Sequence, residues 1–186
     1  MKSRQLLGAI CAVLATVSIA LLGAASAASA DEGRSPRAQQ MRLLDECDAA
    51  TWNAEFPGLC AGAGSVSLAK FRGDLAKGGS GAWWINNREQ TINAGDTLHV
   101  INQGGIVHSF TEVSAYGAGV VPEWNTALPA GTPPAATLEP FFTTFVTSQA
   151  VDPAAARDVP ATQLTRGTHK FQCMIHPWMR TVVTVR

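Results

Sequence analysis

The sequence predicts an all-β protein, a β-sandwich with a short, helical, disulfide-stapled extension on its N-terminal side. From residue 82 onward, short runs rich in β-branched and aromatic residues alternate with turn residues such as Gly95-Asp96 and Gly104-Gly105. Short strands at this spacing are typical of a sandwich and not of a sheet built from βαβ units. About 155 residues follow the first 30, which is enough for one domain with its own core.

The first 30 residues have the features of an export signal. Lys2 and Arg4 form a short basic start, an apolar run covers residues 6–22, and the small residues at 28–30 precede Asp31. A retained membrane anchor is the alternative, but the apolar run is short for a bilayer span of about 20 residues. We therefore expect a signal peptide at 1–30, no stable membrane span after its removal, and an exported chain, either periplasmic or extracellular and at the cell surface.

Residues 31–40 are polar and without an apolar period, so we expect a flexible lead-in there. We expect a helical cap over residues 41–80. Its first part is irregular, with helical turns possible around Met41, Leu44 and Trp52. Its second part contains a clearer helix, with the following signals: Leu68, Phe71 and Leu75 at helical spacing, Ser67 as the N-cap, and Gly78-Gly79 at the end.

The sandwich is expected to occupy residues 81–186. Runs typical of strands lie at 82–86, 90–92, 97–102, 106–113, 141–146, 168–173 and 181–185. Residues 117–160 are rich in Pro, Ala and Gly, so apart from 141–146 they are expected to form long surface loops.

Three cysteines remain after signal removal: Cys47, Cys60 and Cys173. An odd number in an oxidising compartment indicates one disulfide and one thiol that needs another reason to be there. Cys47 and Cys60 are close in sequence and pair most economically, and closing that loop contributes on the order of 3 kcal/mol. Cys173 is then the unpaired thiol.

Cys173, His176 and Met179 form a C-x-x-H-x-x-M run, and His108 at an earlier strand end is the natural fourth member. A thiolate, two imidazoles and a weak thioether are the ligands of a blue-copper electron-transfer site. Each residue also has a plainer interpretation, because a free Cys or a Met is often only a core side chain and a lone His is often hydrogen-bonded in the core. Their combined spacing favours copper.

Residues 81–186 resemble the cupredoxin family, and the plastocyanin and amicyanin group in particular. The resemblance depends on the phrases GDTLHVINQGGIVHSF and GTHKFQCMIHPWM. It implies a Greek-key β-sandwich and one type 1 copper ion held by His108, Cys173, His176 and Met179. The short gap before Met179 looks like amicyanin. Ser109 stands where many relatives have Asn, so the hydrogen bonds around the ligand loop are expected to differ.

The same resemblance also implies a docking surface for redox partner proteins. In such proteins the edge of the loop histidine reaches the surface through an apolar patch where redox proteins dock transiently. Ile106, Pro177 and Trp178 are the candidates for this patch, around the ring of His176.

Other features limit the function. Lys and Arg balance Asp and Glu at 14 each, with no basic block beyond the signal, so no nucleic-acid partner is expected. The two spare histidines, His99 and His169, are too few for a second copper site, so an enzyme is not expected; His169 is interpreted as a hydrogen-bonded core residue. Glu112 is expected to be solvated.

The leading hypothesis is a single-electron carrier, and the alternative is a protein that captures and delivers copper outside the membrane.

Overall fold

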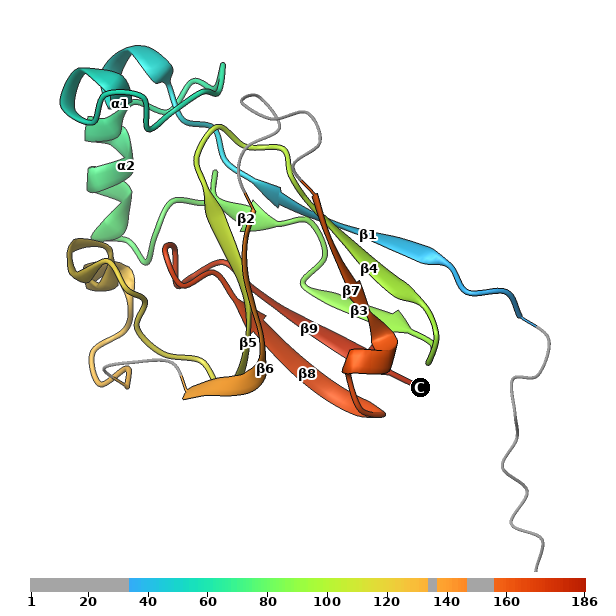
Figure 1. Ribbon diagram of the computed structural model, residues 1–186. Coiled ribbons are helices and arrows are strands. Elements are labelled where there is room, and N and C mark those ends of the chain that lie inside the picture. The colour runs from blue at the N-terminus through green and yellow to red at the C-terminus, as the bar shows by residue number, and fades with distance from the viewer. Residues whose placement is uncertain (1–33, 134–136, 147–155) are drawn as a thin grey trace, which may run out of the picture. The chain divides into compact units, whose positions relative to one another are not determined.

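The computed structural model describes residues 34–133, 137–146 and 156–186, and for 137–146 only the course of the backbone. The expected signal peptide at 1–30 lies outside these residues. Two β-sheets form the main body of residues 35–186, and most of the helices gather at one end of them, while the 3₁₀ helix η2 (Ala161–Gln163) lies apart from these (Figure 1). The strands are β1 Ala38–Leu44, β2 Trp84–Ile85, β3 Glu89–Ile92, β4 Thr97–Asn102, β5 His108–Ala115, β6 Thr137–Val146, β7 Ala156–Pro160, β8 Gly167–Gln172 and β9 Arg180–Val185.

The first sheet has the strand order β2-β1-β4-β7 and the second the order β3-β9-β8-β5-β6. Each sheet contains one parallel pair, β1 with β4 and β3 with β9, and the other pairs are antiparallel. Both sheets are therefore mixed, and strands distant in sequence lie side by side. The expected all-β sandwich class is confirmed.

The core is formed where the inward faces of the two sheets meet. Leu98 and Val100 on β4 are fully buried, and so are Phe110 on β5 and Phe171 on β8, whose rings stack with centroids 4.3 Å apart. Alternation along each strand supplies these residues, because successive side chains point to opposite faces. The ends of β5, β8 and β9 are thereby held in a fixed register.

The cap consists of α1 (Ala49–Glu55), α2 (Leu68–Leu75) and the 3₁₀ helix η1 (Pro122–Ala127). Asp48 and Ser67 cap α1 and α2 through hydrogen bonds accepted from Ala50 and Lys70 backbone N–H groups, as N-cap side chains do. The helix expected from residues 67–79 is confirmed, and so is the Cys47–Cys60 disulfide.

Strand β1 corrects the expectation for residues 31–44. It begins at Ala38, inside the expected lead-in, and it includes Met41 and Leu44, which were expected in helical turns. Met41 and Leu43 alternate inward and are fully buried, and the strand pairs with β4 from Ala38 to Leu43. Pairing with a neighbouring strand, which local sequence does not reveal, decided this segment.

The stretch from 117 to 160 also contains more structure than expected. Strand β6 begins at Thr137, ahead of the expected residue 141, and β7 pairs with β4 within a segment expected to be loop. Only Val159 of β7 is buried, so its sequence carries little strand signal. Among the residues that the structure describes, no helix has both the length and the apolar character needed to cross a membrane.

Candidate metal centre

The four expected ligands lie at strand ends and in the loop between two strands. His108 is the first residue of β5, Cys173 directly follows β8, Met179 directly precedes β9, and His176 lies in the loop between them. The loop is closed by its own backbone, because Cys173 N–H donates to Met179 O at 3.0 Å and Met179 N–H donates to His176 O at 2.9 Å. The spacing of the motif therefore produces a tight turn at the end of the sandwich.

Three donor atoms converge in this turn. Cys173 Sγ lies 3.8 Å from His108 Nδ1 and 3.7 Å from His176 Nδ1, and the two Nδ1 atoms are 3.1 Å apart. Donors about 2.0 to 2.3 Å from a shared metal ion are roughly 3 to 4 Å from each other. All three side chains are fully buried. One sulfur and two imidazole nitrogens at these separations fit a single soft or borderline ion such as copper.

The sulfur of Cys173 receives hydrogen bonds that favour its thiolate form. The backbone N–H groups of Ser109 and His176 donate to Sγ at 3.3 and 3.4 Å. Burial by itself would raise the pKa of this thiol, but His108 and the two amides outweigh it and lower the pKa from the ordinary value of 9.0. Ser109 also clamps the loop, since its Oγ accepts from Met174 N–H at 2.6 Å.

The second nitrogen of His108 contacts a carboxylate. His108 Nε2 lies 2.9 Å from Asp45 Oδ2, and both side chains have an exposed fraction of zero. Burial would lower the pKa of His108, but Asp45 and Cys173 outweigh it and raise the pKa to about 9. Burial would raise the pKa of Asp45, but His108 and backbone N–H groups lower it. The pair is therefore polar and charged, and it lies inside the protein.

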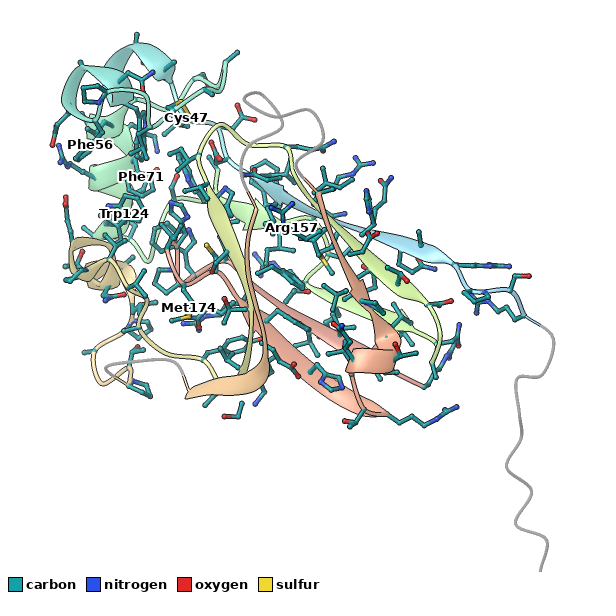
Figure 2. All side chains as sticks on the ribbon, in the orientation of Figure 1. Cys47, Phe56, Phe71, Trp124, Arg157 and Met174 are labelled. Atoms are coloured by element: carbon teal, nitrogen blue, oxygen red, sulfur yellow. A yellow bond between two sulfur atoms is a disulfide. The ribbon has the colours of Figure 1, made fainter. Side chains whose placement is uncertain are left out.

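The second nitrogen of His176 has different surroundings. Trp124 stacks on the His176 ring at 4.6 Å and 16°, and Phe71, Trp83 and Trp178 lie within 6.3 Å of it. Figure 2 places Phe71 and Trp124 at the helical end of the molecule. His176 Nε2 is buried without a hydrogen-bond partner among the described residues. Burial, and then the nearby charge of His108, lower the pKa of His176 well below 6.5.

Met179 is buried, with 1% of its surface exposed, and its backbone is bonded to both Cys173 and His176. Its thioether is therefore carried in the same turn as Cys173 and His176, two of the three converging donors.

The expected docking patch needs a correction. Ile106 is 1% exposed and Pro177 is buried, while Trp178 is partly exposed. The cap residues that enclose His176 account for this difference, because Phe71 of α2 and Trp124 of η1 pack against the ring that was expected to reach the surface. The sequence did not reveal the cover, since Trp124 lies in a stretch expected to be loop.

The spare histidines are bonded elsewhere. His169 Nδ1 lies 2.5 Å from Glu112 Oε1 and its Nε2 lies 2.8 Å from Thr165 O, and His99 pairs with Asp158. His169 is thus a hydrogen-bonded, largely buried residue, as expected. Glu112 is only 6% exposed, so the expectation of a solvated carboxylate was wrong. Its partner comes from the neighbouring strand β8, which sequence spacing could not indicate.

Asp45 is the residue that sequence reasoning missed at this centre. It lies in the extension, 63 positions before His108, and a single Asp near a helical segment is usually exposed. Cys47, two residues further on, is a local sign that the segment folds inward, but it does not point to the ligand.

No protein-family model matches the chain, and no curated protein matches it. Among solved structures it is similar to a purple cupredoxin from Nitrosopumilus maritimus, with 14% identity, a TM-score of 0.44 and coverage of 79% of this chain and 98% of that chain. It is also similar to an amicyanin mutant with Cu(I), at 20% identity and a TM-score of 0.35 over 55% of this chain and 73% of the other. A reduced amicyanin mutant matches at 26% identity and a TM-score of 0.33 over 54% and 70%.

Identity and TM-score are low in each case. The support for a metal centre comes from the geometry of the chain's own residues.

Proposed function

We propose that this protein is a single-electron carrier whose one type 1 copper ion would be held by Cys173 Sγ, His108 Nδ1 and His176 Nδ1, with the thioether of Met179 as a fourth, weaker ligand. The observation that carries the proposal is the fully buried triangle of one sulfur and two imidazole nitrogens, with edges of 3.1 to 3.8 Å. Bound copper would supply a one-electron Cu(II)/Cu(I) couple, and this ligand set suits both oxidation states.

The chain's own residues prepare the centre for electron transfer. The N–H groups of Ser109 and His176 stabilise negative charge on Cys173 Sγ. The backbone bonds between positions 173, 176 and 179 hold the loop in one conformation. The rings around His176 keep water away from its outer edge. A rigid, dry site changes little when its charge changes by one electron, which favours fast transfer.

The alternative function, delivery of copper ions, is less favoured by the same geometry. The donor side chains of Cys173, His108 and His176 all have an exposed fraction of zero. An ion leaving this site must wait for the ligand loop or the cap to open, whereas an electron can leave without any opening. Burial thus supports electron transfer over ion transfer.

We also propose that the protein works outside the cytoplasm and meets redox proteins by transient docking. The Cys47–Cys60 disulfide supports export, because disulfides persist in oxidising compartments. A partner would approach the centre across the rings that enclose His176, and of these Trp178 is partly exposed.

The test is an absorption and paramagnetic-resonance spectrum of the copper-loaded, oxidised protein. We expect an intense visible charge-transfer band from the thiolate, which is lost in Cys173→Ser. Met174→Leu is the matched control, because Met174 is buried beside Cys173 and its Sδ contacts Gln172 Nε2 at 3.8 Å, and this variant should keep the band. A colourless Cu(II) complex, or a band that survives Cys173→Ser, would refute the copper assignment.

A second measurement separates the two functions. Electron self-exchange of the copper protein is compared with copper transfer to a chelating acceptor. Fast self-exchange with slow copper release supports the electron carrier. Slow self-exchange with fast release would favour copper delivery.

A further inference from the structure

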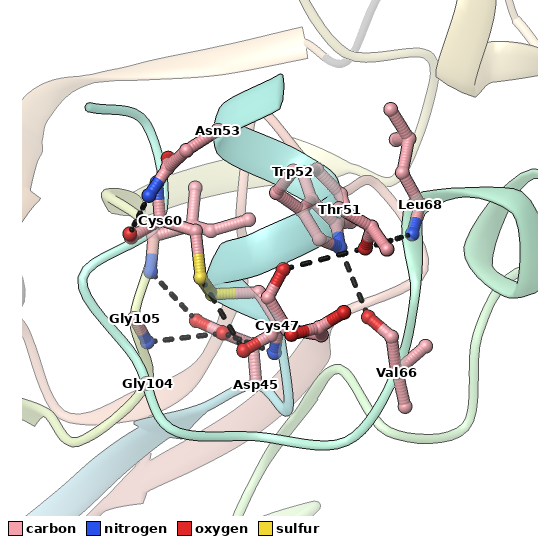
Figure 3. The surroundings of a disulfide bond; sticks show 12 residues. Asp45, Cys47, Thr51, Trp52, Asn53, Cys60, Val66, Leu68, Gly104 and Gly105 are labelled. Atoms are coloured by element: carbon pink, nitrogen blue, oxygen red, sulfur yellow. Dashed lines mark hydrogen bonds between the residues drawn. A yellow bond between two sulfur atoms is a disulfide. The ribbon is translucent and has the colours of Figure 1, made fainter. Parts of the chain in front are cut away.

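The N-terminal extension places one fully buried carboxylate beside a proposed ligand. Asp45 directly follows β1, and its Oδ2 lies 2.9 Å from His108 Nε2. Three backbone N–H groups also donate to this carboxylate: those of Cys47 and Gly105 to Oδ1 at 3.1 and 3.0 Å, and that of Ile106 to Oδ2 at 3.1 Å. Figure 3 shows Asp45 between the disulfide and the Gly104-Gly105 turn.

The packing around Asp45 depends on this close approach. A Cβ atom at Gly104 would lie 1.9 Å from Asp45 Oδ2, and one at Gly105 would lie 2.4 Å from Cys47 Sγ. The turn before His108 therefore needs glycine at both positions in order to meet the extension. Its amides at 105 and 106 and the ring at 108 all point at the same carboxylate.

These contacts determine which nitrogen of His108 carries a proton. A carboxylate that accepts three N–H bonds is ionised and can only accept, so the fourth contact requires an N–H at His108 Nε2. An imidazole that binds a metal ion is neutral, so with its one proton on Nε2 the lone pair is on Nδ1, which faces Cys173 and His176.

We infer that Asp45 is a positioning residue for the proposed copper ligand His108, which fixes Nδ1 as the donor atom and favours Cu(II) over Cu(I) through its buried negative charge. This inference rests on the proposed function. A carboxylate bonded to the outer nitrogen of a ligating imidazole makes the imidazole a stronger donor. A stronger donor and a nearby anion in a dry environment stabilise the higher charge of the ion more, which lowers the reduction potential.

The other imidazole offers an internal contrast. His176 Nε2 has no hydrogen-bond partner among the described residues and is surrounded by rings. Only one of the two histidines is therefore polarised by an anion, and the effect can be assigned to Asp45.

The experiment compares Asp45→Asn and Asp45→Ser with the unmodified protein, all loaded with copper. We expect Cu(II) affinity to fall about 10- to 100-fold, as for other residues that orient metal ligands, and Cu(I) affinity to fall less. Each tenfold difference between the two losses raises the potential by about 59 mV. The thiolate band should persist, since the three donors remain.

Asp96→Asn is the matched control. Asp96 is a buried carboxylate, 2% exposed, that likewise accepts backbone N–H bonds, from Arg37 and Asn93, but it lies at the opposite end of β4 from the His108 turn. The Asp96→Asn variant should have a lower free energy of unfolding and an unchanged reduction potential. A purely structural role for Asp45 would give the same result as this control, with Cu(II) and Cu(I) affinities falling equally and the potential unchanged, and that result would overturn the inference.

A measurement on the unmodified protein covers the case in which the Asp45 variants do not fold. Nitrogen NMR of the Cu(I) form should show His108 with a slowly exchanging proton on Nε2. A bare Nε2, or a proton on Nδ1, would overturn the inference. If the unmodified protein instead lacks the thiolate band, the copper function fails and the inference falls with it, whereas an intact band with an unchanged potential rejects the Asp45 role alone.

Discussion

The two histidines of the candidate centre offer the same donor atom to the same point, yet their outer edges have opposite environments. His108 Nε2 contacts the buried carboxylate of Asp45 at 2.9 Å, whereas His176 Nε2 faces aromatic rings and has no hydrogen-bond partner among the described residues. One imidazole is held by charge and the other by packing. The difference indicates that orientation and electronic tuning come from the first side, and exclusion of water from the second.

The extension contributes to both environments, with Asp45 on the His108 side and Phe71 among the rings on the His176 side. Asp45 and Phe71 lie before residue 81, and Trp52 of α1 stacks at 5.6 Å on Trp83, which lies beside His176. The Cys47–Cys60 disulfide ties this segment together, and Cys47 lies two residues after Asp45. The extension is thus a part of the centre's surroundings on both sides and not a separate appendage.

The largest expected effect comes from opening the aromatic side. Trp124→Ala removes a ring that is 8% exposed and stacked on His176, so the free energy of unfolding of the metal-free protein should fall by about 3 to 5 kcal/mol. Copper should also pass to a chelator faster than from the unmodified protein. Urea unfolding and the decay of the visible band measure the two changes.

Trp84→Ala is the control for Trp124→Ala. Because Trp84 is 37% exposed, its removal should lower the free energy of unfolding much less. If Trp124→Ala released copper no faster than Trp84→Ala, the aromatic rings would not be what closes the site.

The next largest effect concerns the segment that carries Asp45. Replacing both Cys47 and Cys60 by Ser opens a bridge between positions 13 residues apart and should cost about 2 to 4 kcal/mol of unfolding free energy. Because Cys47 N–H donates to Asp45, the potential should also shift in the direction of Asp45→Asn. Voltammetry and urea unfolding test this pair of changes. A stable variant with an unchanged reduction potential would show that the disulfide does not affect the contact between Asp45 and His108.

The smallest expected effect is on acid stability of the cap. Lys70 and Ser80 bond Asp74 and lower its pKa from 3.8, although partial burial opposes them. Because the pKa is lower in the folded state, this stabilisation is complete above 3.8 and is lost as the pH falls through the folded value. Lys70 is 62% exposed, so the effect should be below about 1 kcal/mol.

Urea unfolding of the metal-free protein below pH 4, compared with Asp74→Asn, measures this loss. The unmodified protein should lose more stability over that range than the variant. Parallel curves for the two proteins would mean that the Asp74 pair contributes nothing.

The sequence alone determined the sandwich class, the helix at α2, the disulfide and the convergence of His108, Cys173 and His176. These features follow from local patterns, such as period-2 alternation, a capped apolar period and a closely spaced ligand motif, and local patterns can be read without the fold. Only the tertiary structure decided that Met41 lies in a strand, that Asp45 contacts His108, and that Trp124 covers His176. Each of these depends on which distant segment lies alongside, and that is set by packing between segments that no local pattern connects.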